Sequence, residues 1–251
     1  MKKFLILGSN SFAGSSFINE LLCLKEEVIG ISRSNEKENC VLAYSQNPLK
    51  KKLFTFFKLD LNDNFDEICN LIKKFKPKFI VDFAAQSMVS ESWNWPEHWF
   101  KTNVVAKVKL HKFLINQDFL EKYIRISTPE IYGNSHDVIK EDSLFDPSTP
   151  YAVSQAAIDM SLKTFFKTYQ FPVVFTRFAN FYGPFQQIYR IIPKTILTAQ
   201  LKTRLPLHGG GNSKRSFIFH KDVSSGIIKS IENGNIGESY HFSTKELISI
   251  S

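Results

Sequence analysis

Short β-rich runs alternate with amphipathic helical patterns from the start of the chain to residue 178. Alternation of this kind is typical of βαβ units, in which a helix carries the chain back so that successive strands lie parallel. We therefore predict an α/β fold with a doubly wound parallel sheet. The strands are expected at residues 3–7, 28–32, 53–59, 78–83, 123–127 and 173–178, and the helices near 12–24, 65–75, 97–116 and 152–169.

The alternation stops after Phe178, and the remaining residues predict a smaller lobe. This part contains a helical pattern near residues 191–201, three glycines at 209–211 and a short apolar strand at 216–220. We therefore predict two domains, a large one at residues 1–178 and a partial lobe at 179–251. The final serine would suit the cap of a further helix, so we expect the smaller lobe to be truncated.

The charge balance favours small anionic partners. The chain has 32 Lys and Arg residues against 24 Asp and Glu, a formal net charge of +8, and the basic side chains are dispersed. No basic motif is interleaved with aromatic residues, so we expect a phosphorylated small molecule as partner and no nucleic acid. No apolar run approaches the roughly 20 residues that cross a bilayer, so no membrane partner is expected.

The cysteines predict neither a disulfide framework nor a metal site. Only Cys23, Cys40 and Cys69 occur, with no paired spacing to one another or to histidine. Such isolated cysteines are typical of buried, reduced thiols in a cytoplasmic protein. The apolar run at the start of the chain breaks at Gly8, too early for a secretory signal, which favours the same location.

A glycine-rich turn follows the first predicted strand and opens the first helix. Gly8, Ser11, Phe12 and Gly14 lie in this turn. Such a turn lets backbone N–H groups and the helix N-terminus bind a pyrophosphate, as in the Rossmann dinucleotide site. We expect these four residues to bind a dinucleotide; the alternative is a plain strand-to-helix turn, which gives the same pattern.

The second predicted strand ends without the acidic residue that hydrogen-bonds the ribose of NAD. Arg33 stands there instead, and its guanidinium can bind a 2′-phosphate, which favours NADP as the cofactor and leaves NAD possible. The alternative for Arg33 is an exposed loop charge. Asp60 and Leu61 follow the third strand and are expected at the adenine edge of this site. The alternative for Asp60 is a cap of the following helix.

Two further motifs are more specific than the glycine turn. Thr128 and Glu130 lie in Ser-Thr-Pro-Glu-Ile-Tyr-Gly after the fifth predicted strand, and Tyr151 opens Tyr-Ala-Val-Ser-Gln at the next helix. They resemble the Thr and Tyr-x-x-x-Lys elements of extended short-chain dehydrogenases/reductases. With Ala-Ala-Gln-Ser at 84–87, Asn-Phe-Tyr-Gly-Pro at 180–184 and Arg-Ser-Phe-Ile at 215–218, the chain resembles the dTDP-glucose and GDP-mannose 4,6-dehydratases along nearly its whole length.

The resemblance implies a nucleotide-sugar 4,6-dehydratase, an NAD(P)-dependent lyase. Tyr151, oriented by Thr128, would remove the proton of the sugar 4-hydroxyl while hydride leaves C4 for the nicotinamide. Glu130 would then take the C5 proton, water would leave from C6, and the hydride would return to C6. The product would be a 4-keto-6-deoxy sugar, with no net change in the cofactor.

Three positions depart from the family pattern. Ser11 replaces a glycine of the turn, and Pro129 replaces the acid of the dTDP-glucose branch that protonates the departing hydroxyl. Gln155 replaces the lysine that lowers the tyrosine pKa and hydrogen-bonds the nicotinamide ribose. An unperturbed tyrosine has a pKa of about 10. We therefore expect activity to be shifted to alkaline pH, with a gain near neutral pH when lysine is restored at position 155.

The resemblance also implies the remaining ligand contacts and an assembly. The cofactor is expected to lie beside Ala84 and Ala85, and the nucleotide diphosphate sugar to be bound by Ser87, Asn180, Arg190 and Arg215. Dimers of the family are built on two long helices, here residues 97–116 and 152–169, so a homodimer is expected. Trp93, Trp95 and Trp99 are expected to pack in the core or on the dimer surface.

Two other functions fit the same motifs. A nucleotide-sugar 4-epimerase or 4-dehydrogenase would need Tyr151 and Thr128 but not Glu130. A catalytically impaired homologue that binds the nucleotide sugar without turnover would be consistent with Gln155 and Pro129. Loss of water from the product distinguishes the dehydratase from the epimerase or dehydrogenase. Absence of turnover indicates the impaired homologue.

Overall fold

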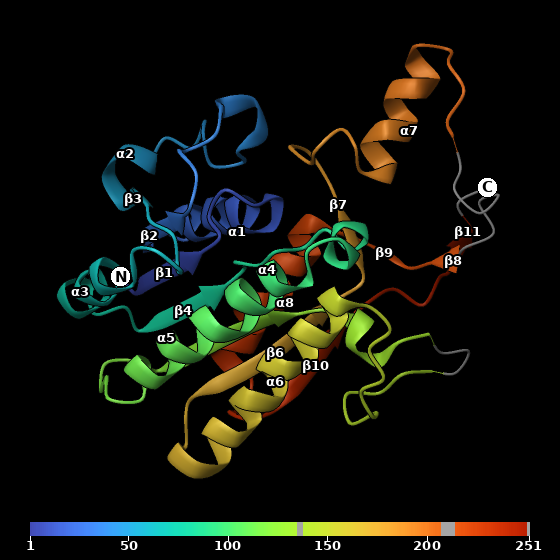
Figure 1. Ribbon diagram of the computed structural model, residues 1–251. Helices are drawn as coiled ribbons and strands as arrows, with labels where there is room; N and C mark the ends of the chain where they lie inside the picture. The colour runs from blue at the N-terminus through green and yellow to red at the C-terminus, as the bar shows by residue number, and fades with distance from the viewer. Residues whose placement is uncertain (135–137, 207–213, 250–251) are drawn as a thin grey trace.

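A computed structural model describes residues 1–134, 138–206 and 214–249. Its centre is a seven-stranded sheet with the order β10-β6-β5-β4-β1-β2-β3 (Figure 1), and every neighbouring pair is parallel. The predicted doubly wound α/β fold is confirmed. The strands are β1 (Lys3–Leu7), β2 (Glu27–Ser32), β3 (Phe54–Lys58), β4 (Phe79–Asp82), β5 (Lys122–Ser127), β6 (Val173–Phe178) and β10 (Ser239–Phe242).

The strand order reverses between β1 and β4. From β1 the chain builds outward through β2 to β3, and it then returns to β4 and builds the other way. Leu7 lies beside Asp82 in this central pair. In an open parallel sheet the loops leaving such a reversal diverge to opposite faces, which leaves a crevice at the carboxyl ends of the strands. The fold therefore predicts a ligand site after β1 and β4.

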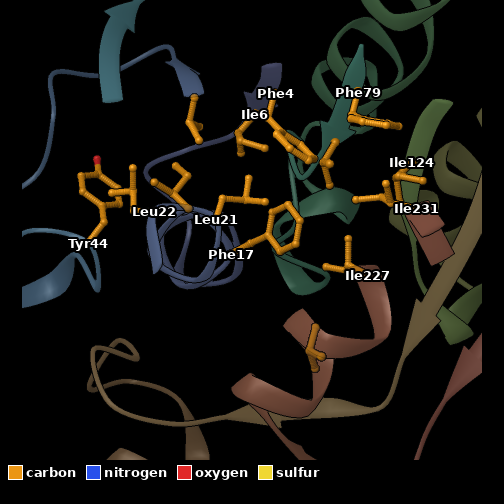
Figure 2. Packing of buried hydrophobic residues seen from close by; sticks show 14 of the residues in the cluster. Phe4, Ile6, Phe17, Leu21, Leu22, Tyr44, Phe79, Ile124, Ile227 and Ile231 are labelled. Atoms are coloured by element: carbon orange, nitrogen blue, oxygen red, sulfur yellow. The ribbon is translucent and has the colours of Figure 1, made fainter. Parts of the chain in front are cut away.

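Helices cover both faces of the sheet. Alternate residues of β1 point to opposite faces, as strand geometry requires, so Phe4 and Ile6 join one core cluster and Leu5 and Leu7 another. The first cluster is closed by α1 (Phe12–Cys23) and α8 (His220–Asn233), and Figure 2 shows Phe17 and Ile227 of these helices packing under the strands. The second cluster is closed by α3 (Phe65–Phe75), α5 (Ala106–Leu114) and α6 (Pro150–Tyr169).

One predicted helix is divided. The segment expected as a helix near residues 97–116 consists of α4 (Pro96–Phe100), a π-helical turn at Lys101–Val105, and α5. The change of hydrogen-bond register has no signature in the apolar spacing, which stays close to 3.6 residues through the turn. A π-helical turn inserted into a helix frequently marks a functional site.

The segment after Phe178 contributes more to the sheet than its sequence indicates. Helix α8 and strand β10 were not predicted, and β10 pairs with β6 as the seventh strand. The rest of this segment forms β7 (Asn180–Tyr182) beside β9 (Phe217–Phe219), β8 (Lys214–Arg215) beside β11 (Ile248–Ser249), and the exposed helix α7 (Ile191–Gln200). A short helix, α2 (Lys50–Leu53), precedes β3 earlier in the chain. The predicted helix near 191–201 and strand near 216–220 are present, whereas the three glycines at 209–211 lie outside the described residues. The division into domains at residues 178 and 179 stays a prediction.

We predict that α8 is part of the main folding unit. Ile227 is completely buried in the first core cluster, so Ile227→Ala should lower the free energy of unfolding by about 2–5 kcal/mol. Ile196→Ala on α7 is the matched control, because this side chain is 56% exposed and its loss should change stability by less than about 0.5 kcal/mol. Urea unfolding measures both. Equal effects would mean that α8 does not fold with the sheet.

Candidate active site

The turn between β1 and α1 is packed too tightly for side chains at two positions. Gly8 has a φ of +79°, and a Cβ on it would lie 2.7 Å from the backbone nitrogen of Ala84 at the end of β4. A Cβ on Gly14 would lie 2.4 Å from the carbonyl oxygen of Gly8. Ser11 caps α1, because its hydroxyl oxygen accepts a 3.0 Å hydrogen bond from the Gly14 N–H. The turn is therefore the close-packed glycine turn that a dinucleotide pyrophosphate requires.

Asn10 fastens this turn to the loop after β2. Its backbone N–H donates to the Ser32 hydroxyl at 2.9 Å, and its side-chain amide donates to the Asn35 carbonyl at 2.8 Å. Arg33 lies in this loop with its side chain exposed. The sequence analysis missed Asn10 and Ser32; the signal for them was a buried polar pair at the ends of two neighbouring parallel strands.

Asp60 and Leu61 have structural contacts in this conformation. The Asp60 carboxylate accepts hydrogen bonds from the Asn62 backbone at 2.7 Å and from the Asn62 side chain at 3.0 Å, and Leu61 is buried in the second core cluster. The Asp60 N–H donates to Asn64, the residue before α3. Asp60 thus organises the turn that leads into α3, but Asn64 is the residue at the N-cap of that helix, so Asp60 is not the helix cap of the alternative interpretation.

The loop after β4 is held by a buried asparagine. The Asn103 side chain accepts a hydrogen bond from the Gln86 N–H at 2.8 Å and donates to the Gln86 carbonyl at 3.1 Å. The same amide donates to the Ser154 hydroxyl of α6 at 3.0 Å. Asn103 lies in the π-helical turn, which thereby joins this loop to α6. The sequence analysis missed it, although a lone asparagine within an amphipathic helix was a signal.

The loop after β4 also contains three of the predicted ligand residues. The backbone nitrogen of Ala84 is the atom that approaches Gly8, and its N–H donates to the Asp82 carboxylate at 3.1 Å. Ala85 and Ser87 are exposed. Their side chains are therefore available to a ligand above the carboxyl end of the sheet.

Thr128, Glu130 and Tyr151 come together at the carboxyl end of β5. Thr128 follows the strand directly, and its hydroxyl accepts a 3.3 Å hydrogen bond from the Glu130 N–H. Tyr151 lies in the first turn of α6 and hydrogen-bonds the Thr128 hydroxyl. Burial raises the pKa of Tyr151, and so does the nearby charge of Glu130, whereas the Thr128 hydrogen bond lowers it. The Thr128 hydroxyl is thus hydrogen-bonded to the Tyr151 side chain and to the Glu130 backbone, and the Glu130 charge acts on the Tyr151 phenol.

Glu130 faces the predicted phosphate-binding arginines. Its side chain is exposed at the rim of the site, yet the surrounding protein displaces enough water to raise the pKa of its carboxyl group. The positive charges of Arg215 and Arg190 lower the same pKa by a smaller amount. A carboxyl group with a raised pKa is suited to both accepting and returning a proton.

Asn180, another predicted substrate ligand, lies on β7, and its side chain is exposed.

Gln155 is buried one helical turn after Tyr151. Its side-chain oxygen accepts a hydrogen bond from the Arg125 guanidinium of β5. Arg125 is in turn bound by Asp159, whose other oxygen accepts hydrogen bonds from Ser127 at 2.6 Å and from Arg177 at 3.0 Å. The sequence analysis did not identify this buried cluster, because its members come from β5, β6 and α6.

The remaining expectations concern thiols, metals and membranes. Cys69 is buried, but Cys23 and Cys40 are exposed, so the expectation that all three would be buried was wrong. The described residues contain no group of His, Cys, Asp or Glu side chains arranged to hold a metal ion. Within the same part of the chain, no helix combines the length and the apolar character needed to span a bilayer. Trp99 is buried, whereas Trp93 and Trp95 are exposed.

This fold and site define an extended short-chain dehydrogenase/reductase, with a glycine turn at the sheet reversal and a Thr–Tyr pair beside it. Residues 5–251 match the family described as GDP-mannose 4,6 dehydratase, and the chain belongs to that family. It is 28% identical over 249 residues to a probable dTDP-glucose 4,6-dehydratase of Sinorhizobium fredii, covering 95% of this chain and 70% of the relative. It is 30% identical over 251 residues to human dTDP-D-glucose 4,6-dehydratase, covering 99% and 71%.

Solved structures give the same result. The crystal structure of DesIV, a dTDP-glucose 4,6-dehydratase from Streptomyces venezuelae with NAD bound, has a TM-score of 0.87 and 27% identity, covering 98% of this chain and 77% of that one. UDP-glucose 4-epimerase from Thermotoga maritima has a TM-score of 0.88 at 22% identity, covering 99% and 79%, a likeness of fold alone. Dehydratases and epimerases therefore share this architecture, and the site residues must distinguish them.

We predict that Gly14 cannot carry a side chain without loss of stability. The added methyl group of Gly14→Ala would meet the Gly8 carbonyl oxygen at 2.4 Å, so α1 must shift and the free energy of unfolding should fall by about 1–3 kcal/mol. Ser11→Gly is the control, since it removes only the capping hydroxyl and should cost a few tenths of a kcal/mol, about as much as other Ser-to-Gly cap changes. Chemical denaturation compares the two. If Gly14→Ala unfolded like the wild type, the turn would not be close-packed.

Proposed function

We propose that this chain is a nucleotide-sugar 4,6-dehydratase that uses a bound nicotinamide dinucleotide. The observation that carries the proposal is the Thr128–Tyr151 hydrogen bond at the carboxyl edge of β5, together with Glu130, whose carboxylate charge acts on Tyr151 and whose backbone N–H donates to the Thr128 hydroxyl. The first two suffice for C4 oxidation. A carboxyl group beside them is what elimination of water requires in addition.

The glycine turn fits the cofactor. A Cβ at Gly8 or Gly14 would meet backbone atoms, so glycine leaves the turn as close to β4 as the pyrophosphate site demands. When bound there, the nicotinamide supplies hydride removal from sugar C4 and hydride return to C6. Tyr151 removes the proton of the 4-hydroxyl, and Thr128 orients the phenol oxygen. The enzyme belongs to the NAD(P)-dependent lyases.

Glu130 carries out the elimination. Oxidation at C4 acidifies the C5 proton, and the Glu130 carboxylate accepts it. The departing C6 hydroxyl needs a proton, which Pro129 cannot supply. The Glu130 carboxyl, now protonated, returns its proton to this hydroxyl, so that water leaves and the carboxylate is regenerated. Its raised pKa supports both halves of this exchange. Return of hydride to C6 requires one proton at C5, and the proton that Tyr151 took from the 4-hydroxyl balances it, which restores the tyrosinate.

The substrate is a nucleotide diphosphate sugar. Arg190 and Arg215 both act electrostatically on Glu130, which supports their binding of the diphosphate beside the sugar. Asn180 and Ser87 are exposed near the same edge and are proposed to contact the diphosphate or sugar. The net charge of +8 is consistent with an anionic substrate.

The exposed apolar side chains support a homodimer. Trp95, Phe100 and Val105 lie on or beside α4 and the π-helical turn, and Val153 and Met160 lie on α6, all more than a third exposed. These helices are neighbours in the fold, and exposed apolar side chains gathered on neighbouring elements are typical of interaction surfaces. We propose that two copies pair through these helices. The three free cysteines support a reducing, cytoplasmic location.

We predict that Glu130→Gln separates the two halves of the reaction. The wild type, incubated with NAD or NADP and a panel of nucleotide hexoses, should release a keto-sugar that has lost water, detected by mass spectrometry. Glu130→Gln should lose this product while C4 oxidation remains measurable. Tyr151→Phe should lower both by about 10²–10⁴-fold, and Tyr169→Phe, on an exposed tyrosine at the far end of α6, should leave both unchanged.

Other outcomes would contradict the dehydratase assignment. A wild-type product that keeps its water would indicate the 4-epimerase or 4-dehydrogenase function, which does not need Glu130. Binding of the nucleotide sugar without turnover would indicate an impaired homologue. Unchanged dehydration by Glu130→Gln would reject the role given to that carboxyl group.

We predict that Arg33 selects NADP. Its exposed guanidinium lies in the loop that Asn10 ties to the glycine turn, where a 2′-phosphate would reach it. Arg33→Ala should weaken NADP binding by about tenfold or more, since charge-assisted hydrogen bonds contribute about 1.5–3 kcal/mol, and should leave NAD binding unchanged. Isothermal titration with each dinucleotide measures this. Equal binding of both by the wild type would contradict this selection, and tighter binding of NAD would favour the dinucleotide bound in the DesIV structure.

A further inference from the structure

Arg125 is a buried guanidinium whose hydrogen bonds fix its position. From β5, its Nε donates to Asp159 at 2.9 Å and its Nη1 to the Ile126 carbonyl at 2.6 Å. Its Nη2 donates to the side-chain oxygen of Gln155. The Arg125 side chain is completely buried. A buried cation is costly unless it is paired and hydrogen-bonded, so this arrangement holds the charge in one place.

The pairing does not neutralise the cluster. Asp159 is shared between Arg125 and Arg177, so two guanidinium groups bind one carboxylate. The neighbouring Lys107 and Asp82 form their own ion pair at 2.6 Å. Burial lowers the pKa of His111 to about 3, so it is uncharged near neutral pH. The ion pairs of these buried groups therefore leave one positive charge in excess beneath the site.

This charge acts on the catalytic tyrosine. Gln155 is four residues after Tyr151 on α6, which places the two side chains on one face of the helix. The charges of Glu130, Arg125 and Arg190 act on the Tyr151 phenol, and Thr128 is hydrogen-bonded to it. Burial and Glu130 raise its pKa, whereas the Thr128 hydrogen bond and then the charges of Arg125 and Arg190 lower it. Of the two arginines, only Arg125 is buried and bonded to position 155.

We propose that Arg125 is a positioning residue that supplies, through Gln155, the positive charge and the fixed hydrogen-bond donor for which the related enzymes use a lysine at position 155. Arg125 occupies the oxygen of the Gln155 carboxamide, so the remaining polar atom, the amide nitrogen, can only donate. The guanidinium charge meanwhile stabilises the Tyr151 phenolate. This inference deepens the proposed function and rests on it.

The proposal changes the expectation for lysine at position 155. The sequence alone predicts that Gln155→Lys improves activity near neutral pH. In the structure, a lysine there would meet Arg125 in a buried site whose one carboxylate is already shared. Gln155→Lys should therefore destabilise the protein, because like charges in a buried site repel. Arg125→Met combined with Gln155→Lys should restore stability relative to Gln155→Lys alone.

The direct test measures ionisation of Tyr151 in the full chain. Tyrosines labelled with ¹³C at Cζ are titrated by NMR, and the Tyr151 signal is assigned by its loss in Tyr151→Phe. Arg125→Met should raise the apparent pKa of Tyr151 by about one unit or more, the scale expected from losing a nearby opposite charge. Arg125→Lys, which keeps the charge, should restore most of the shift. A purely structural role for Arg125 would lower stability and leave the tyrosine pKa unchanged.

Two further variants control for damage to the cluster. Arg177→Met removes the other guanidinium from Asp159 without touching Gln155, so its effect on the Tyr151 pKa should be smaller. Gln155→Glu keeps the side-chain shape and forms an ion pair with Arg125, so it should fold even if Arg125→Met does not. It should also raise the Tyr151 pKa, because it neutralises the guanidinium. An unchanged Tyr151 pKa in either folded variant, Arg125→Met or Gln155→Glu, overturns the proposal.

The titration does not depend on turnover. If no nucleotide sugar is converted but the Tyr151 pKa rises in Arg125→Met, the electrostatic coupling is supported and the dehydratase function fails. If the wild type forms dehydrated product, the acid limb of kcat/KM against pH should move to higher pH in Arg125→Met by the same amount as the Tyr151 pKa. An unmoved limb with intact turnover contradicts the coupling alone.

Discussion

The reversal of strand order between β1 and β4 is the constraint on which the site depends. It opens the crevice at the carboxyl edge of the sheet, and the backbones after these two strands approach so closely that a Cβ at Gly8 would lie 2.7 Å from Ala84. Because all neighbouring strands are parallel, the residues that follow β1, β4 and β5 collect at this one edge. The glycine turn and the Thr128–Tyr151 pair are thus brought together by topology.

Buried charge underlies the same edge. Asp82 binds Lys107 and Tyr123, and Asp159 binds Arg125, Arg177 and Ser127. The Arg177 guanidinium also lies 5.4 Å from the Tyr132 ring and 5.5 Å from the Phe145 ring, which compensates in part for nitrogen atoms that lack a hydrogen-bond partner. Such networks contribute little net stability but are costly to break. Here they fix the positive charge of Arg125, which stabilises the phenolate form of Tyr151.

The elements that could be predicted from the sequence are those with a clear local pattern of apolar residues. Five of the six predicted strands are mostly buried on both faces, and the sixth, the edge strand β3, is rich in phenylalanine. By contrast β10, Ser-Tyr-His-Phe, is short, half polar and at the other edge of the sheet. Helix α8 was missed because Ser224, Ser225 and Gly226 weaken its helical propensity. Thr128, Glu130 and Tyr151 were predicted from the two sequence motifs that resemble those of the family. The partner of Gln155 could not be found, since Arg125 is 30 residues away on a strand whose pattern is otherwise ordinary.

A crystal structure with a nicotinamide dinucleotide and a nucleotide diphosphate hexose tests the account most directly. The account predicts that the pyrophosphate of the dinucleotide lies at Gly8 and Gly14, and that the sugar 4-hydroxyl lies about 3 Å from the Tyr151 oxygen, within hydrogen-bond reach. The Glu130 carboxyl should face C5 and C6. A sugar bound away from Tyr151, or a dinucleotide excluded from the turn, would contradict it.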